Sequence, residues 1–316
     1  MPSYIYNIKQ SLCRNSIILW VLVIVTYITF YLSCSPLKAA DFRIGKNRSA
    51  TEGRVLCWVM TNPTNHRMKA IHVQRTWGRR CNKLIFMSSE EDPELSSVVA
   101  LNVEEGRDHL WAKTKEAFKY IYQHHLDEAE WFLKADDDTY VIVENLRFFL
   151  KDFDSNNAVS LGCKFTQGFF SGGAGYVLSK ESVKRFVENS LLDGSKCRQE
   201  HDGLEDLEMG TCLYNIGIET TDTRDTIGRY RFLPFNPQIE VVPRNPSDKY
   251  WFYMYYPESK GENLETVSAN PLHDYIADEM HPMDYMSDRV ISFHYVPPKQ
   301  MYFMDHLLYH VRLHKV

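Results

Sequence analysis

The hydrophobic residues of this chain follow two different patterns. Residues 15–37 contain no charged side chain, and within them Ile17–Leu32 is apolar except for two threonines. A membrane-spanning helix needs about 20 mostly apolar residues, so we expect a retained signal-anchor at residues 16–35. A cleaved secretory signal is the alternative, because Ser33-Cys34-Ser35 could serve as a small-residue cleavage site.

Beyond this segment, short apolar runs alternate with amphipathic ones. The clearest helical pattern spaces its inward positions by three and four residues, at Leu110, Thr114, Ala117, Phe118, Ile121 and His125. Further helices are expected at His66–Trp77, ended by Gly78, from near Val141, from Ser179 as cap through Val187, and from Glu205. Strands are expected at Val55–Met60, Lys83–Met87, Val98–Val103, Trp131–Ala135 and Val290–Val296.

This alternation predicts the fold class. Strands that alternate with helices favour an α/β domain with a mostly parallel central sheet flanked by helices, which we place at residues 54–316. Residues 36–53 are polar and form a predicted stem, and residues 1–15 form a short tail before the anchor. In sheets of this kind, ligands bind beyond the carboxyl ends of the strands.

Composition and charge narrow the class of function. The 316 residues include 41 acidic and 36 basic side chains, which gives a formal net charge of −5. Nucleic-acid binders usually have a basic excess, so we expect no nucleic-acid partner. The apolar fraction of 44% is that of a folded protein, which argues against disorder over most of the chain.

The orientation of the anchor is not settled by the lysines and arginines on its two sides. Asn47-Arg48-Ser49 is an N-glycosylation sequon in the polar stem, which favours a luminal position for Asn47 and all that follows. Five cysteines after the anchor also suit a secretory compartment.

Four of these cysteines suggest two disulfides. Cys57 and Cys81 flank the first strand–helix unit, and Cys197 and Cys212 flank an acidic segment, which would leave Cys163 over. Spacing alone cannot choose the pairing, and five buried thiols are the alternative.

An acidic triplet directly follows the strand Trp131–Ala135. In extended backbone Asp136 and Asp138 point the same way and can converge on one point. Two carboxylates so close repel each other unless a cation or hydrogen-bond donors lie between them, and a hard divalent cation meets this need. Such a cation can also hold a diphosphate leaving group. The alternative is a solvated acidic turn that caps the following helix.

Other segments carry candidate chemistry of less specific kinds. A carboxylate in Glu205-Asp206 could act as a general base, or could belong to an exposed helix turn. His294, in an apolar strand, is either a core residue or a metal ligand. Ser171–Gly175 is glycine-rich without a phosphate-loop motif, which indicates close approach to a ligand or another segment. The aromatic run Tyr250–Tyr256 suits a buried strand or a surface on which a pyranose stacks.

Taken together, these motifs resemble the core 1 β1,3-galactosyltransferase (T-synthase) family, an inverting group of β1,3-glycosyltransferases. The similarity extends from about Val55 to about Arg312. The segments that carry it are Val55–Thr61, Cys81–Glu90, Glu105–Asp108, Trp131–Tyr140, Ser171–Glu181, Glu205-Asp206, Arg224–Gly228 and Ser292–Val296.

The resemblance implies a single-pass type II Golgi membrane enzyme with a luminal GT-A catalytic domain, often homodimeric. It implies transfer of galactose from UDP-galactose to O-3 of N-acetylgalactosamine on serine or threonine of glycoproteins. Asp136, Asp138 and His294 would hold Mn²⁺, and Asp206 would be the base. Trp251 would lie at the acceptor sugar. The donor would lie near Met60, Arg107, Lys113, Asp136 and Tyr295, where the basic pair suits a diphosphate.

The chain departs from the family in two places. Tyr285-Met286 stands where relatives have a cysteine pair, so that disulfide cannot form, and Phe252 and Met254 alter the aromatic segment. Both changes bear on the acceptor side. Two alternatives therefore stay open, a divergent β1,3-transferase with another sugar and a non-catalytic chaperone-like paralogue. The presence of Asp136, Asp138, Asp206 and His294 argues against the second.

Overall fold

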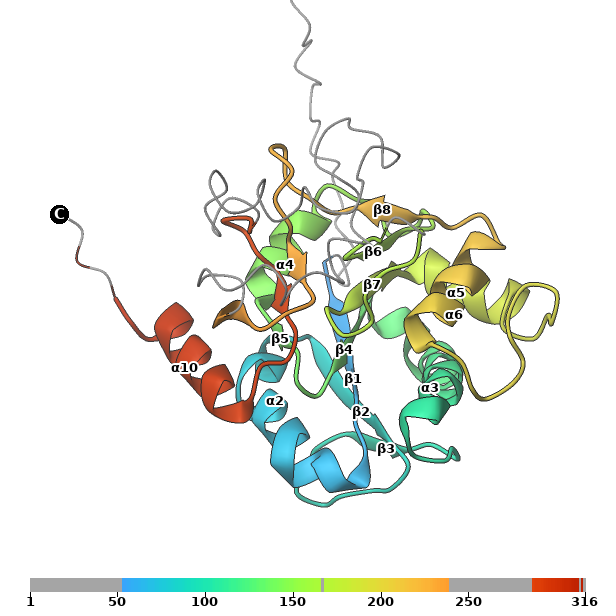
Figure 1. The fold of residues 1–316 in the computed structure, drawn as a ribbon, viewed down its shortest axis with the longest axis horizontal. Helices are drawn as coiled ribbons and strands as arrows, with labels where there is room; N and C mark the ends of the chain where they lie inside the picture. Colours follow the sequence, from blue (N-terminus) through green and yellow to red (C-terminus); the bar gives the residue numbers. More distant parts are fainter. Residues whose placement is uncertain (1–52, 166–167, 239–285, 313, 315–316) are drawn as a thin grey trace, which may run out of the picture. The chain divides into compact units, whose positions relative to one another are not determined.

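A seven-stranded sheet in the order β3-β2-β1-β4-β7-β6-β8 forms the centre of the computed structural model (Figure 1). β3, β2, β1 and β4 are parallel, β7 runs antiparallel to both β4 and β6, and β8 is parallel to β6. The predicted α/β architecture with a mostly parallel sheet is therefore confirmed. The strands are β1 Val55–Met60, β2 Lys83–Ser88, β3 Val98–Ala100, β4 Trp131–Asp136, β6 Ser160–Gly162, β7 Tyr176–Ser179 and β8 Thr220–Asp222.

The structure describes residues 53–165, 168–238, 286–312 and 314. The expected anchor, the sequon at Asn47, the aromatic run with Trp251, Phe252 and Met254, and Tyr285 lie outside these residues. Among the residues that are described, no helix has both the length and the hydropathy needed to cross a membrane.

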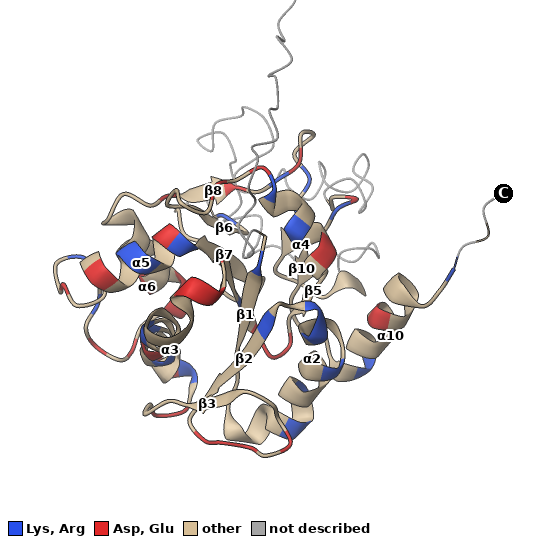
Figure 2. Ribbon diagram, turned by 180° about the vertical axis from the view of Figure 1, so that it is seen from behind, with Lys and Arg blue, Asp and Glu red and all other residues tan. Residues whose placement is uncertain are grey.

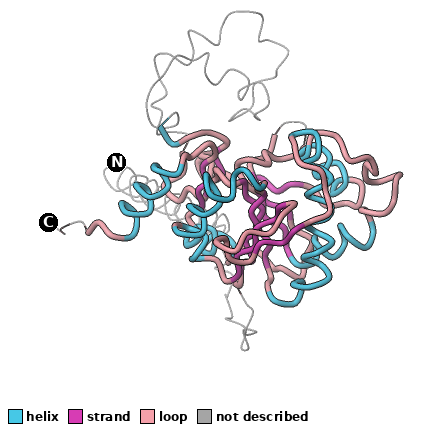
Figure 3. The backbone as a smooth tube through the Cα atoms, turned by 90° about the horizontal axis from the view of Figure 1, so that it is seen from below, coloured by secondary structure: helices cyan, strands magenta, loops and turns pink. Residues whose placement is uncertain are grey.

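Helices cover both faces of the sheet, which is why its central strands are apolar along their whole length. Val55, Cys57 and Val59 of β1 face one core, and the intervening residues face the other. Figure 3 shows the strands as a layer between helices. The first core is shared with α2 Ile71–Arg75, α4 Val143–Leu150 and α10 Pro298–Tyr309, and the second with α3 Leu110–His125, α5 Lys180–Asn189 and α6 Glu205–Tyr214.

A second, three-stranded sheet adjoins the first core. It has the order β5-β10-β9, with β5 Tyr140–Val141, β9 Phe232–Leu233 and β10 Ser292–Phe293. The predicted strand Val290–Val296 is thus much shorter than expected. Its ladder ends at Phe293, and Tyr295 then takes a left-handed backbone with φ of 54°, which a regular strand does not accommodate.

Local signals in the sequence set several helix ends. α3 begins and ends at the first and last positions of the predicted helical face, and Ser179 caps α5 by accepting a hydrogen bond from the Ser182 amide at 3.1 Å. The single helix expected at His66–Trp77 is wrong in detail. It consists of a π-helical turn η2 His66–Ala70 followed by α2, and a 3₁₀ turn η3 Trp77–Arg80 continues past Gly78. Three further 3₁₀ turns are η1 Pro63–Asn65, η4 Arg107–His109 and η5 Leu126–Glu128.

Two disulfides join Cys57 to Cys81 and Cys197 to Cys212. The first ties β1 to the segment that follows η3, and the second ties α6 to the loop before it. Cys163 is buried and takes part in neither. Met286 packs against the first core, and its backbone forms an isolated parallel β-bridge with that of Tyr230.

Candidate active site

The acidic triplet lies where the large sheet passes into the small one. β4 ends at Asp136 and β5 begins at Tyr140, and the Thr139 amide donates to the Asp136 carbonyl at 3.1 Å. Residues 137 and 138 therefore form a tight turn, so the expectation that the triplet is extended is wrong. The turn is held by the Thr139 hydroxyl, which accepts from the Asp136 amide at 3.1 Å and donates to the Gly173 carbonyl at 2.8 Å.

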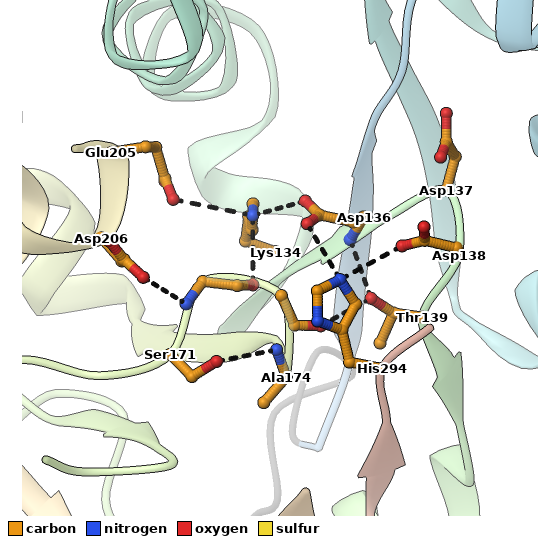
Figure 4. Close-up of polar contacts among 12 residues, drawn as sticks. Lys134, Asp136, Asp137, Asp138, Thr139, Ser171, Ala174, Glu205, Asp206 and His294 are labelled. Carbon is orange, nitrogen blue, oxygen red and sulfur yellow. Dashed lines mark hydrogen bonds and ion pairs between the residues drawn. The ribbon is translucent and has the colours of Figure 1, made fainter. Parts of the chain in front are cut away.

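The small sheet brings His294 to this turn. β10 pairs with β5 through Ser292–Val141 and Phe293–Tyr140, and the Val296 amide donates to the Asp138 carbonyl at 2.8 Å. His294 follows directly, and its Nε2 lies 3.2 Å from Asp138 Oδ1 and 3.6 Å from Asp136 Oδ2 (Figure 4). One ligand atom from each of the three side chains lies within 4.8 Å of the others.

This donor set is chemically suited to a divalent first-row cation. Carboxylate oxygens favour Mg²⁺ and Mn²⁺, and an imidazole nitrogen shifts the preference toward the transition metal. All three side chains are half-buried, so an ion placed between them would keep access to a ligand from solvent.

The protein also supplies its own cations to the two aspartates. Lys134 Nζ lies 2.6 Å from Asp136 Oδ1, and Lys69 Nζ lies 2.9 Å from Asp138 Oδ2. Burial acts to lower the pKa of Lys134, but the charges of Asp136 and Glu205 raise it above its usual value. Burial acts to raise the pKa of Asp138, but hydrogen bonds and charges from His294 and Lys69 hold it below its usual range. The Asp138 carboxylate is therefore stabilised as an anion.

Asp137, the middle residue of the triplet, has a different role. Its carboxylate accepts from the Thr61 hydroxyl at 2.8 Å and from the Asn65 side-chain amide at 2.9 Å. Burial raises the pKa of Asp137 to about 6. Asp137 thus fixes the loop after β1 against the turn after β4, and in Figure 4 it points away from His294.

The glycine run packs against His294 and Glu205, so the approach expected from the sequence is to other segments of the chain. A Cβ placed on Gly173 would lie 2.5 Å from Nε2 of His294 and closer still to two other ring atoms. A Cβ on Gly172 would lie 2.6 Å from Oε2 of Glu205. Only glycine allows the loop to pass between the histidine and the start of α6.

The two carboxylates at the start of α6 differ in environment. Glu205 is buried and accepts from the hydroxyls of Thr114 and Tyr176 at 3.0 Å each, and its burial raises its pKa in spite of nearby Lys134. Asp206 is half-buried, and its Oδ2 accepts from the Gly172 amide at 3.3 Å. Of the two, Asp206 is the carboxylate with solvent access.

The residues expected at the donor are placed unequally. Met60 pairs with Asp136 across β1 and β4, so both lie at the carboxyl ends of parallel strands. Tyr295 is exposed and stacks on His294 with ring centroids 3.8 Å apart, and Arg107 is exposed. Lys113, the other basic residue expected near the donor, is paired within the protein. It is buried and donates to Glu105 at 2.6 Å and to the Thr61 carbonyl at 2.7 Å.

Sequence reasoning missed several residues of this site. Lys134 had a signal, since a lysine in an apolar strand two residues before Asp136 shares its face. No sequence signal distinguished Lys69 from the other basic residues of His66–Trp77. Figure 2 shows basic residues in and around α2 on one side of the sheet, and acidic residues at the start of α6 on the other side, which carries α3.

Comparison with known proteins identifies the family of this chain. The Fringe-like family matches residues 51–226. The chain is 40% identical to glycoprotein-N-acetylgalactosamine 3-beta-galactosyltransferase 1 of Xenopus laevis over 287 residues, which cover 87% of this chain and 73% of that protein. It is 30% identical to chondroitin sulfate synthase 3 of Homo sapiens over 183 residues, which cover 50% of this chain and 20% of that one.

Among solved structures, the galactosyltransferase LgtC in complex with donor and acceptor sugar analogues aligns with 81% of this chain and 97% of its own, with a TM-score of 0.41 at 9% identity. The family match and the Xenopus relative confirm the resemblance drawn from the sequence motifs. The chain belongs to the Fringe-like family and, within it, to the core 1 β1,3-galactosyltransferase family.

Proposed function

We propose that this protein is an inverting glycosyltransferase that moves galactose from UDP-galactose to O-3 of N-acetylgalactosamine on serine or threonine of glycoproteins. The name of the Xenopus relative supports this acceptor and this linkage. The observation that carries the proposal is the convergence of Asp136, Asp138 and His294 beside a separate, accessible carboxylate, Asp206. Family membership supports a GT-A type of architecture.

In this proposal Asp136, Asp138 and His294 hold Mn²⁺, which when bound neutralises the diphosphate of the donor. Asp206 takes the proton from the acceptor hydroxyl. The acceptor oxygen then forms a bond to the anomeric carbon while the bond from that carbon to the phosphate oxygen breaks, so UDP leaves and the configuration inverts. Gly172, whose amide donates to Asp206, orients the base.

We further propose that Met60, Arg107, Asp136 and Tyr295 contact the donor. Lys113 supports these contacts indirectly, since its ammonium donates a hydrogen bond to the carbonyl of Thr61, the residue directly after Met60. Trp251 is the proposed contact for the acceptor sugar.

The cellular setting is part of the same proposal. Residues 1–15 are a cytosolic tail, 16–35 a type II signal-anchor in the Golgi membrane, 36–53 a luminal stem with a glycan at Asn47, and 54–316 the luminal catalytic domain, which forms a homodimer. The uncharged apolar stretch and the two disulfides support a secretory-pathway location.

The test is transfer by the purified full-length protein in detergent, with UDP-galactose, Mn²⁺ and a peptide bearing N-acetylgalactosamine. We expect a β1,3-linked disaccharide whose formation stops on addition of EDTA. Product formation unchanged by EDTA would contradict the metal site. Transfer only from another UDP-sugar or to another glycan would identify a divergent transferase, and absence of any transfer would favour the chaperone-like alternative.

A further inference from the structure

Asp136 and Asp138 each form an ion pair with a different lysine, and the two lysines differ in how freely their side chains can move. The side chain of Lys134 is 2% exposed, and besides Asp136 it contacts the Gly172 carbonyl at 3.1 Å and Glu205 at 3.7 Å. The side chain of Lys69 is 36% exposed, and among the described residues its ion pairs are with carboxylates of the triplet, Asp138 at 2.9 Å and Asp137 at 3.6 Å. Lys134 is fixed by its surroundings, whereas Lys69 is exposed enough to move from the carboxylates to a ligand that offers it another negative charge.

The two oxygens of Asp138 are divided between different partners. Oδ1 faces His294, on the side of the proposed metal site, and Oδ2 faces Lys69. A divalent cation held by Oδ1 would therefore lie close to the ammonium bound at Oδ2. Like charges at such a distance repel, so Lys69 opposes binding of the cation alone.

A nucleotide diphosphate changes this balance. It brings negative charge to the cation, and a lysine that is half-exposed and beside the cation site can exchange a carboxylate for a phosphate oxygen. We propose that Lys69 exchanges Asp138 for the diphosphate when the nucleotide binds, and so makes metal and nucleotide binding depend on each other. The inference rests on the proposed function and adds to it a coupling between two ligands, which must be reciprocal.

Lys69→Met separates this role from a structural one, because the proposal expects Mn²⁺ alone to bind more tightly and UDP to bind more weakly. By calorimetry on the full-length protein, we expect the variant to bind Mn²⁺ alone about fivefold more tightly, as for loss of one half-exposed charge interaction. We expect it to bind UDP at saturating Mn²⁺ about tenfold more weakly, since one charge-assisted hydrogen bond is lost. The factor by which UDP tightens Mn²⁺ binding should fall about fivefold.

Two controls limit the interpretation. Arg67→Met removes a cation from the same helical turn, but Arg67 is 72% exposed and pairs with Glu94, so all affinities should stay at wild-type values. Uridine, which lacks phosphates, should bind wild type and Lys69→Met equally.

The outcomes are distinct. An unchanged coupling factor in Lys69→Met, or weaker binding of Mn²⁺ alone, would overturn the inference, the latter because it would make Lys69 a residue that positions Asp138. Equal losses for UDP and uridine would also overturn it. Failure of the wild-type protein to bind UDP in a Mn²⁺-dependent way would instead refute the proposed function.

Discussion

Replacement of Gly173 by alanine tests whether His294 belongs to a metal site. The added methyl group would lie 2.5 Å from Nε2 of His294 and nearer to Cε1 and Nδ1, whereas ordinary contacts begin at 3.4 Å. The imidazole must therefore move by about 1 Å or more, because packed atoms do not overlap. It cannot do so and keep its position beside Asp136 and Asp138.

A ligand that is moved from its position lowers the affinity of the site for its metal ion. Disturbing the groups that orient a ligand reduces metal affinity by about 10- to 100-fold, and we expect a loss of this size for Mn²⁺ in Gly173→Ala. The assay is calorimetric titration of Mn²⁺ into the metal-free full-length protein, with the melting temperature measured in parallel to show that the variant is folded.

Gly194→Ala is the matched control. Its new Cβ would meet only Gln199 Cγ at 3.5 Å, an ordinary contact, so its affinity for Mn²⁺ should equal that of the wild type. If folded Gly173→Ala bound Mn²⁺ as tightly as Gly194→Ala, the assignment of His294 as a ligand would be refuted.

Three other substitutions test separate parts of the site. Asp206→Asn should abolish transfer but leave Mn²⁺-dependent UDP binding intact, and turnover retained in a product assay would remove Asp206 as the base. Lys134→Met should lower the free energy of unfolding by roughly 3–5 kcal/mol, measured in urea, because it leaves Glu205 buried without its counter-charge; a loss below 1 kcal/mol would show that the pair is not coupled. Because burial raises the pKa of Asp137 to about 6, folding takes up a proton between about pH 4 and pH 6, and this contribution to stability is lost as the pH rises through that window. In metal-free Asp137→Asn that loss should be absent, and identical pH profiles of stability for variant and wild type would contradict the shift.

Local order along the chain was predictable from the sequence. The apolar run of β1 reflects burial on both faces, and the spacing of α3 reflects burial on one. Ser179 marked the start of α5 because a capping hydroxyl works within a few residues of itself. The acidic residues of the site could also be recognised, since carboxylates clustered at the end of a buried strand repel each other unless a cation or hydrogen-bond donors lie between them.

The assembly of the site was decided by tertiary structure. Only the pairing of β10 with β5 brings His294 to Asp138, and periodicity contains no information on which distant strand will be a neighbour. The same holds for the choice between Glu205 and Asp206 and for the lysines that hold the aspartates. Sequence patterns indicate on which face of its helix or strand a residue lies. Its partners, its burial and the balance of charge around it depend on contacts made throughout the fold.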